Sequence, residues 1–204
     1  MKVLMVVAHP DDEVLFGWPL LQSRGASWLY VMTNNRAKYR DGPMKALREV
    51  AALNGAVLLN EPRVDTNVYR LPTRDAPLTL TSAVHAMTDD IKRAVLTYAP
   101  DALFTHNPMG EYGHGDHRLL FNALSTLKLP MLLTDICFSN LCHVSSDIAP
   151  RYHRTAYSQA VRVGSYTLDA AWYERMRQVY VSHHAWSWSG HKPVSTCSLF
   201  LFKP

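Results

Sequence analysis

The chain has 204 residues, of which 48% are hydrophobic and 19% charged, and its formal net charge is +4. A chain of this size and composition can bury one sizeable apolar core, so we expect a single domain over residues 1–204. Lysines and arginines form no long block, and no window of about 18 uninterrupted apolar residues occurs, so we expect neither a nucleic-acid partner nor a membrane span.

Short apolar runs alternate with stretches of helical spacing, and this alternation predicts the elements. In chain order we expect a strand over 1–8, a helix over 13–24, a strand over 28–33, a helix over 43–53, a strand over 56–59, a loop over 60–80, a helix over 82–98, a strand over 101–106, a helix over 116–127, a strand over 131–138, a polar loop around 142–157, a helix over 167–181 and a strand over 197–202. The pattern favours an α/β fold with a mostly parallel sheet covered on both faces. Ligands of such sheets bind beyond the carboxyl ends of the strands.

The number and spacing of the cysteines indicate the cellular compartment. Cys137, Cys142 and Cys197 are odd in number and show no CxxC spacing, which favours free thiols over a disulfide framework. The first residues do not match the pattern of a secretory signal peptide. We therefore expect a cytoplasmic protein, and the sequence is compatible with a homo-oligomer.

The motif AHPDDE follows the first predicted strand directly. His9 leaves the strand, and Asp11, Asp12 and Glu13 open the next predicted helix. A helix N-terminus explains one or two acids, because acids cap helices and suit the helix dipole. It explains neither the histidine nor two adjacent carboxylates at a buried strand end. A bound cation would explain both.

A second polar cluster, FTHNPMGEYGHGDHR over residues 104–118, follows the predicted strand 101–106. It contains three histidines, two acids and a tyrosine, namely His106, Glu111, Tyr112, His114, Asp116 and His117. His114 and His117 are three residues apart and share a helical face, whereas Asp116 points elsewhere and could orient an imidazole. The alternative is a polar loop with a helix cap. So many histidines in so short a stretch favour a metal or acid–base site.

Together the two clusters supply the ligand set of a catalytic zinc site. The set comprises His9, one of Asp11 and Asp12, and one of His114 and His117, which leaves an open coordination position. Another divalent transition metal would also suit it. Such a metal lowers the pKa of a bound water to about 7 and polarises a substrate carbonyl. One of the adjacent aspartates could then hold the metal while the other takes a proton.

AHPDDE, followed about a hundred residues later by a strand and a GHxDH-type motif, resembles the PIG-L/LmbE-like N-acetylglucosaminyl deacetylases. The resemblance covers residues 1–33 and 95–120. It implies a Rossmann-like three-layer α/β sandwich with the strand order 3-2-1-4-5. It also implies a zinc-dependent hydrolase that removes an N-acyl group from an amino sugar or its conjugate.

The resemblance also implies roles for individual residues. They are His9, Asp12 and His117 as metal ligands, Asp11 as general base, His114 as the residue that protonates the leaving amine or stabilises the oxyanion, Asp116 as the acid between the histidines, and Tyr112 as a group near the oxyanion. Arg36 and Arg48 are candidates for substrate contacts, although neither has a clear counterpart in the family pattern. Arg36 follows the second predicted strand and so belongs to the site side of the sheet.

Two other functions remain open at this point. One is a non-catalytic α/β module that binds a sugar or nucleotide, but a degenerate site would be expected to lose Asp11 or a ligand, and none is lost. The other is a metal hydrolase that acts on a different amide or ester. The segment HHAWSWSGH (residues 183–191) is either a sugar-stacking lid or a set of packed tryptophans with solvated histidines, and we prefer the second interpretation.

Overall fold

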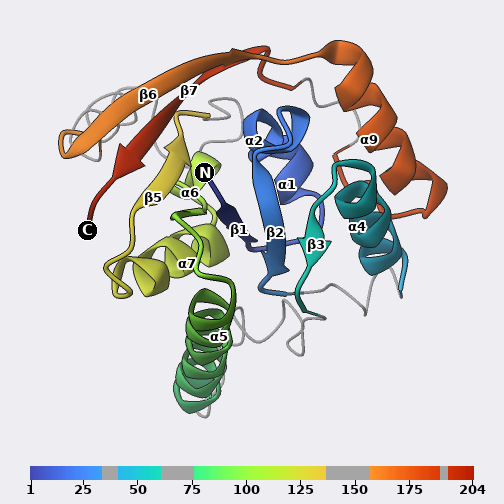
Figure 1. Cartoon of the computed structure of the whole chain (residues 1–204). Helices are drawn as coiled ribbons and strands as arrows, with labels where there is room; N and C mark the ends of the chain where they lie inside the picture. Colours follow the sequence, from blue (N-terminus) through green and yellow to red (C-terminus); the bar gives the residue numbers. More distant parts are fainter. Residues whose placement is uncertain (34–40, 61–75, 137–156, 189–192) are drawn as a thin grey trace.

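The strands form one sheet whose first five members are parallel. The structure is a computed structural model that describes residues 1–33, 41–60, 76–136, 157–188 and 193–204. Its strands are β1 (Val3–Val7), β2 (Ala26–Val31), β3 (Val57–Leu58), β4 (Ala102–Phe104), β5 (Met131–Thr134), β6 (Ala160–Thr167) and β7 (Thr196–Phe202). The order β3-β2-β1-β4-β5 confirms the prediction, and β7 and then β6 extend the sheet as antiparallel strands (Figure 1).

Helices cover both faces of this sheet. They are α1 (Asp12–Leu15), α2 (Trp18–Gln22), α4 (Gly42–Leu53), α5 (Ala76–Tyr98), α6 (Gly110–Gly113), α7 (Gly115–Ser125) and α9 (Ala170–Ser182). Because side chains alternate along a strand, Val3 and Met5 of β1 join the apolar core beneath α1, α2, α4 and α9, whereas Leu4 and Val6 join the core beneath α5 and α7. The two cores confirm the three-layer sandwich.

The central strand β1 positions the site. All five of its residues are buried, and it lies between β2 and β4. Its pairing with β4 is parallel, with Met5 opposite Phe104, so the two strands end side by side. The chain that follows β1 carries AHPDDE, and the chain that follows β4 carries the second polar cluster. The topology therefore brings the two motifs together.

The helix predicted over 13–24 is wrong as one helix, because the structure has α1 and α2 there. Pro19 has no N–H to donate to the carbonyl of Leu15, so a continuous helix would lose that bond. Pro19 instead lies in the first turn of α2, where a proline N–H is not needed. Gly17 separates the helices, and a Cβ there would come within 2.8 Å of the Glu13 carbonyl oxygen.

Three other predicted boundaries are also wrong. Helix α5 begins at Ala76, inside the predicted loop 60–80, because a proline at position 77 suits the first turn of a helix. The strand predicted over 131–138 ends at Thr134. The start of the helix predicted over 167–181 belongs to β6, and α9 begins only after Asp169, whose carboxylate accepts two backbone N–H groups of its first turn. We had predicted no strand at β6, because it is an exposed edge strand with mixed polarity.

The described ranges contain no helix that is both long and apolar enough to cross a membrane. All described strands belong to one sheet, in agreement with a single domain. The cytoplasmic location, the domain limits at residues 1 and 204 and the oligomeric state stay predictions.

Candidate metal and catalytic site

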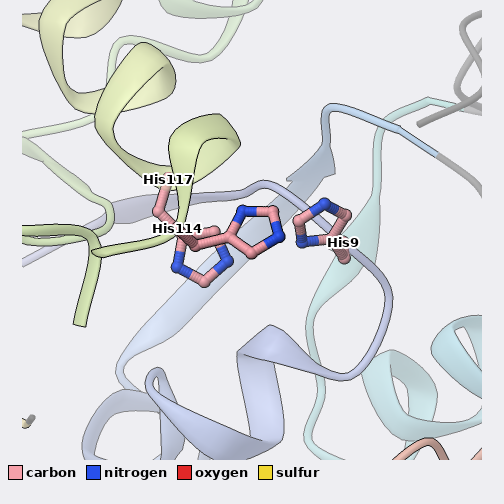
Figure 2. Close-up of side chains that lie close together, drawn as sticks. All are labelled: His9, His114 and His117. Atoms are coloured by element: carbon pink, nitrogen blue, oxygen red, sulfur yellow. The ribbon is translucent and has the colours of Figure 1, made fainter. Parts of the chain in front are cut away.

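The two sequence motifs meet at the carboxyl ends of β1 and β4. Figure 2 shows His114 and His117 extending from the first turn of α7 toward His9, which lies on the turn after β1. The ring centroids of His9 and His114 are 4.9 Å apart, and those of His114 and His117 are 4.7 Å apart. The structure therefore brings His9 to two imidazoles that lie more than a hundred residues later in the sequence.

Asp12 lies among these histidines. Its Oδ2 atom accepts the backbone N–H of His9 at 2.8 Å and lies 3.2 Å from Nδ1 of the same residue. The same oxygen is 3.3 Å from Nε2 of His117 and 3.3 Å from Nε2 of His106. Burial opposes ionisation, but the surrounding histidines hold the pKa of Asp12 well below its usual range. Asp12 is therefore an ionised carboxylate in contact with three rings.

Hydrogen bonds to the backbone argue against two of the histidines as ligands. His114 accepts the N–H of Asp116 at Nδ1 (3.2 Å), so we assign its proton to Nε2. His106 accepts the N–H of Ala8 at Nε2 (3.0 Å), so we assign its proton to Nδ1, which lies 3.0 Å from Glu111 Oε2. Burial and the nearby imidazoles lower the pKa of His114 to about 4, in agreement with a neutral ring. Each ring has its lone pair already engaged.

The other two histidines each face Asp12 with one ring nitrogen. Nδ1 of His117 lies 2.6 Å from Glu111 Oε2 and donates to it, while Nε2 is buried and has no hydrogen-bond partner among the described residues. Nε2 of His9 donates to Asp116 Oδ2 at 2.9 Å, which leaves Nδ1 facing Asp12. Asp12 Oδ2 thus lies within 3.3 Å of a ring nitrogen of each histidine, and such a group of atoms fits a divalent cation, which would take the place of the proton on Nδ1 of His9. Asp116 orients His9, the role expected of an acid that points away from His114 and His117.

The electrostatics of the pocket favour positive charge. Burial alone would lower the pKa of His9, yet the carboxylates of Asp12 and Asp116 raise it to about 10. Ligand atoms of His9, His114 and His117 lie within 4.8 Å of one another, as do those of a second set formed by Asp12, His106 and His117. His117 belongs to both sets, so it is the residue at which they join.

Asp11 has a different environment from its neighbour. It precedes α1 with φ at 104°, and its side chain makes no capping hydrogen bond, so the helix-cap interpretation fails. Its Oδ2 accepts the hydroxyl of Ser187 at 3.0 Å, and its backbone N–H donates to Glu13 Oε2 at 3.0 Å. Glu13 in turn accepts the hydroxyl of Tyr180 at 2.6 Å. Burial, followed by the charges of Asp12 and Glu13, raises the pKa of Asp11 well above its usual range.

The segment after α9 reaches the site, although we preferred the interpretation that leaves it outside. Trp186 packs near Tyr180, as the packed-tryptophan interpretation requires. Ser187, however, contacts Asp11, and the ring of Trp188 lies 5.6 Å from that of Tyr112. Tyr112 is half-buried, and its ring is 5.5 Å from that of His114. The packed-tryptophan interpretation therefore fits Trp186 but does not account for the contacts of Ser187 and Trp188, and residues 189–191 lie outside the described residues.

The two predicted substrate contacts stay predictions. Arg36 lies outside the described residues, and Arg48 is exposed on α4. Sequence reasoning also missed the roles of Glu13, Glu111 and Ser187. The two glutamates were visible only as acids within the motifs, and Ser187 carries no signal because its partner is 176 residues away.

A parallel α/β sheet with a histidine–carboxylate cluster at its carboxyl edge, and a buried acid beside that cluster, defines a hydrolase with a candidate metal centre. The family model described as PIG-L, GlcNAc-PI de-N-acetylase, matches residues 4–128, and the chain belongs to this family. It is therefore an N-deacetylase, and the resemblance drawn from the two motifs is confirmed. A comparison with curated proteins finds no match.

Solved structures with the same fold are also deacetylases. A deacetylase–teicoplanin complex from the biosynthesis pathway of teicoplanin is 14% identical, covers 100% of this chain and 99% of its own, and has a TM-score of 0.60. The A40926 pseudoaglycone deacetylase is 13% identical, covers 98% of this chain and 97% of its own, and has a TM-score of 0.56. At these identities the likeness shows the shared fold.

Proposed function

We propose that the protein removes the N-acyl group, typically acetyl, from an amino sugar or its conjugate in a zinc-dependent hydrolysis. The observation that carries the proposal is the position of Asp12 Oδ2, which lies within 3.3 Å of a ring nitrogen of both His9 and His117. Support for an amino-sugar substrate comes from the family description, which names GlcNAc. The names of two structural neighbours, which mention teicoplanin and the A40926 pseudoaglycone, are compatible with a sugar carried on a larger molecule.

His9, Asp12 and His117 would hold the metal, and two imidazoles with one carboxylate suit zinc or a related divalent transition metal. When bound, the ion supplies Lewis-acid polarisation of the substrate carbonyl and makes a water more acidic. Asp116 keeps the ring of His9 in place through the 2.9 Å contact to Nε2. The protein thus provides both the ligands and the support for one of them.

Asp11 is the general base of the proposed reaction. It neighbours Asp12 in sequence, but its side chain turns to Ser187, so the two carboxylates face different partners. Asp11 takes a proton from the attacking water as oxygen adds to the amide carbon. When the carbon–nitrogen bond breaks, the same residue can return that proton to the leaving amine. The products are then a free amino group and a carboxylic acid.

His114 and Tyr112 stabilise the charge that develops on the carbonyl oxygen. The backbone bond to Nδ1 fixes the proton of His114 on Nε2, which makes this atom a hydrogen-bond donor. Burial raises the pKa of Tyr112, so its hydroxyl also stays a donor. Donors aimed at a developing oxyanion are among the largest contributions to acyl-transfer catalysis. Of the two roles that the family resemblance allows His114, this geometry favours oxyanion stabilisation.

Two measurements test the proposal. Metal analysis of the purified protein should find one zinc per chain, and His9→Ala and His117→Ala should each lose it. His85→Ala, a histidine exposed on α5, is the matched control and should retain it. Zinc content equal to that of the parent in both site variants would refute the ligand assignment.

An amine-release screen with the zinc-loaded protein tests the substrate class. N-acetylglucosamine, its glycosides and N-acyl glycoconjugates should release a free amine, whereas simple amides should not. Release from simple amides alone would show a different amidohydrolase. If the protein binds these sugars but releases an amine from none of them, it is a non-catalytic binding module.

A further inference from the structure

Glu111 contacts two histidines of the site through one oxygen of its carboxylate. Its Oε2 atom lies 3.0 Å from Nδ1 of His106 and 2.6 Å from Nδ1 of His117. The two rings are stacked with centroids 3.7 Å apart and planes 18° apart, and their Nε2 atoms both point to Asp12. All these side chains are buried, with Glu111 at 1% exposure. One carboxylate oxygen therefore contacts the Nδ1 atoms of both imidazoles.

The backbone at Glu111 is strained, and Asn107 holds it in place. The dihedral angles of Glu111 are φ 56° and ψ −56°, inside a short kinked helix where a non-glycine residue rarely occurs. Asn107 Oδ1 accepts the N–H of Glu111 at 3.2 Å, and the N–H of Asn107 donates to Glu111 Oε1 at 2.9 Å. The amide of Asn107 is itself anchored to the carbonyl of Ile136 at 3.1 Å. Strain that a surrounding network maintains in this way is typical of functional sites.

We propose that Glu111 is a positioning residue that keeps the proton of His117 on Nδ1, so that Nε2 stays unprotonated and directed at Asp12. The inference rests on the proposed metal site. An ionised carboxylate can only accept hydrogen bonds, so each ring that it contacts must present an N–H to it. Carboxylates behind metal-binding histidines fix ring orientation and raise ligand basicity in the same way.

The same contacts argue against Glu111 as the general base. Both of its oxygens are engaged, Oε1 by Asn107 and Oε2 by the two rings. Its carboxylate acts on the site through His117.

Glu111→Gln tests the inference. Glutamine has one acceptor oxygen and one donor NH₂, so either the two rings or the N–H of Asn107 would face a donor. The rings are then expected to shift their protons, which leaves His117 with a proton on Nε2. The matched control is Glu49→Gln, because Glu49 also pairs with a histidine, Nε2 of His183 at 3.0 Å, but in an exposed position.

The first readout is the ring ¹⁵N chemical shifts of His117 in the metal-free protein at pH 8.5. The second is zinc affinity by competition with a chromophoric chelator. In Glu111→Gln the proton should move to Nε2, and the zinc affinity should fall by about 10–100-fold. Glu49→Gln should change neither readout.

Two results would overturn the inference. One is a proton on Nε2 of His117 in the metal-free parent, a measurement that stands even when Glu111→Gln fails to fold. The other is Glu111→Gln with an unchanged proton position and an unchanged zinc affinity. A parent that binds no zinc but keeps its Nδ1 proton would contradict the proposed metal site and leave the proton-positioning role of Glu111 supported.

Discussion

The hydroxyl of Tyr180 donates a hydrogen bond to Glu13 beneath the site, and Tyr180→Phe removes it. The donor–acceptor distance is 2.6 Å, and both side chains are 0% exposed. The substitution deletes one oxygen and keeps the ring, so it leaves little cavity. Burial raises the pKa of Glu13 to about 7, so its carboxylate is mostly ionised at pH 8. A hydrogen bond to a charged group contributes about 1.5–3 kcal/mol, and we expect the free energy of unfolding at pH 8 to fall by about 2 kcal/mol. For a domain of this size that corresponds to a decrease in Tm of about 4–8 °C.

The same helix provides the control. Tyr173 lies seven residues earlier on α9, its ring is 6.3 Å from that of Trp186, and the ring of Tyr180 is 6.0 Å from the same tryptophan. The hydroxyl of Tyr173 is buried and has no hydrogen-bond partner in the part of the chain that the structure describes. Tyr173→Phe should therefore leave the stability unchanged or slightly increase it, because it removes an unsatisfied polar atom.

Urea unfolding of the metal-free parent and both variants, followed by circular dichroism, measures the two effects. The denaturant dependence m should stay constant, so that shifts in the midpoint report stability alone. If the two variants agree to within about 0.5 kcal/mol, the bond between Tyr180 and Glu13 contributes nothing measurable, and the reasoning is refuted.

Three further predictions concern catalysis and reactivity. Asp11→Asn should retain zinc and lose about two to four decades of kcat with little change in KM, as steady-state amine release will show, and activity within a few-fold of the parent would place the base elsewhere. His114→Ala should also retain zinc and turn over about a hundredfold more slowly, whereas loss of zinc from this variant would mean that His114 is a ligand. Burial and the nearby Asp135 raise the pKa of the Cys197 thiol to about 12. In a variant without the other two cysteines, a disulfide reagent at pH 8 should therefore react about a thousandfold more slowly with Cys197 than with an ordinary thiol. Rapid labelling of the folded protein would contradict that expectation.

The parts of the fold that the sequence predicted are those with strong local patterns. The buried run of β1 and the AHPDDE motif after it fixed where one half of the site begins, and GHGDH after β4 fixed the other. Strand β6 escaped prediction because an exposed edge strand shows little alternation. The sequence did not predict that the helix over 13–24 divides into α1 and α2, although Pro19 lacks the N–H that a continuous helix would need there.

The proton positions at the site could not be predicted, because they depend on contacts between distant segments. The lone pair of His106 is engaged by the N–H of Ala8, 98 residues away, and this contact alone separates His106 from the candidate ligands. The carboxylate of Asp11 meets Ser187 across 176 residues. Sequence spacing indicated which side chains gather at the site, whereas the hydrogen bonds indicate which nitrogen of each histidine carries the proton.

The two apolar cores have a consequence for the order of events in the cell. The turn that carries His9 and Asp12 is closed by its own bonds, from the N–H of His9 to Asp12 Oδ2 at 2.8 Å and from the N–H of Asp12 to the carbonyl of His9 at 3.3 Å. Packing above and below β1 fixes where this turn stands. We therefore expect folding to need no ion, in contrast to zinc fingers, whose binding free energy is also folding free energy. A metal would enter a finished protein and could be exchanged there, and its affinity would report the site alone.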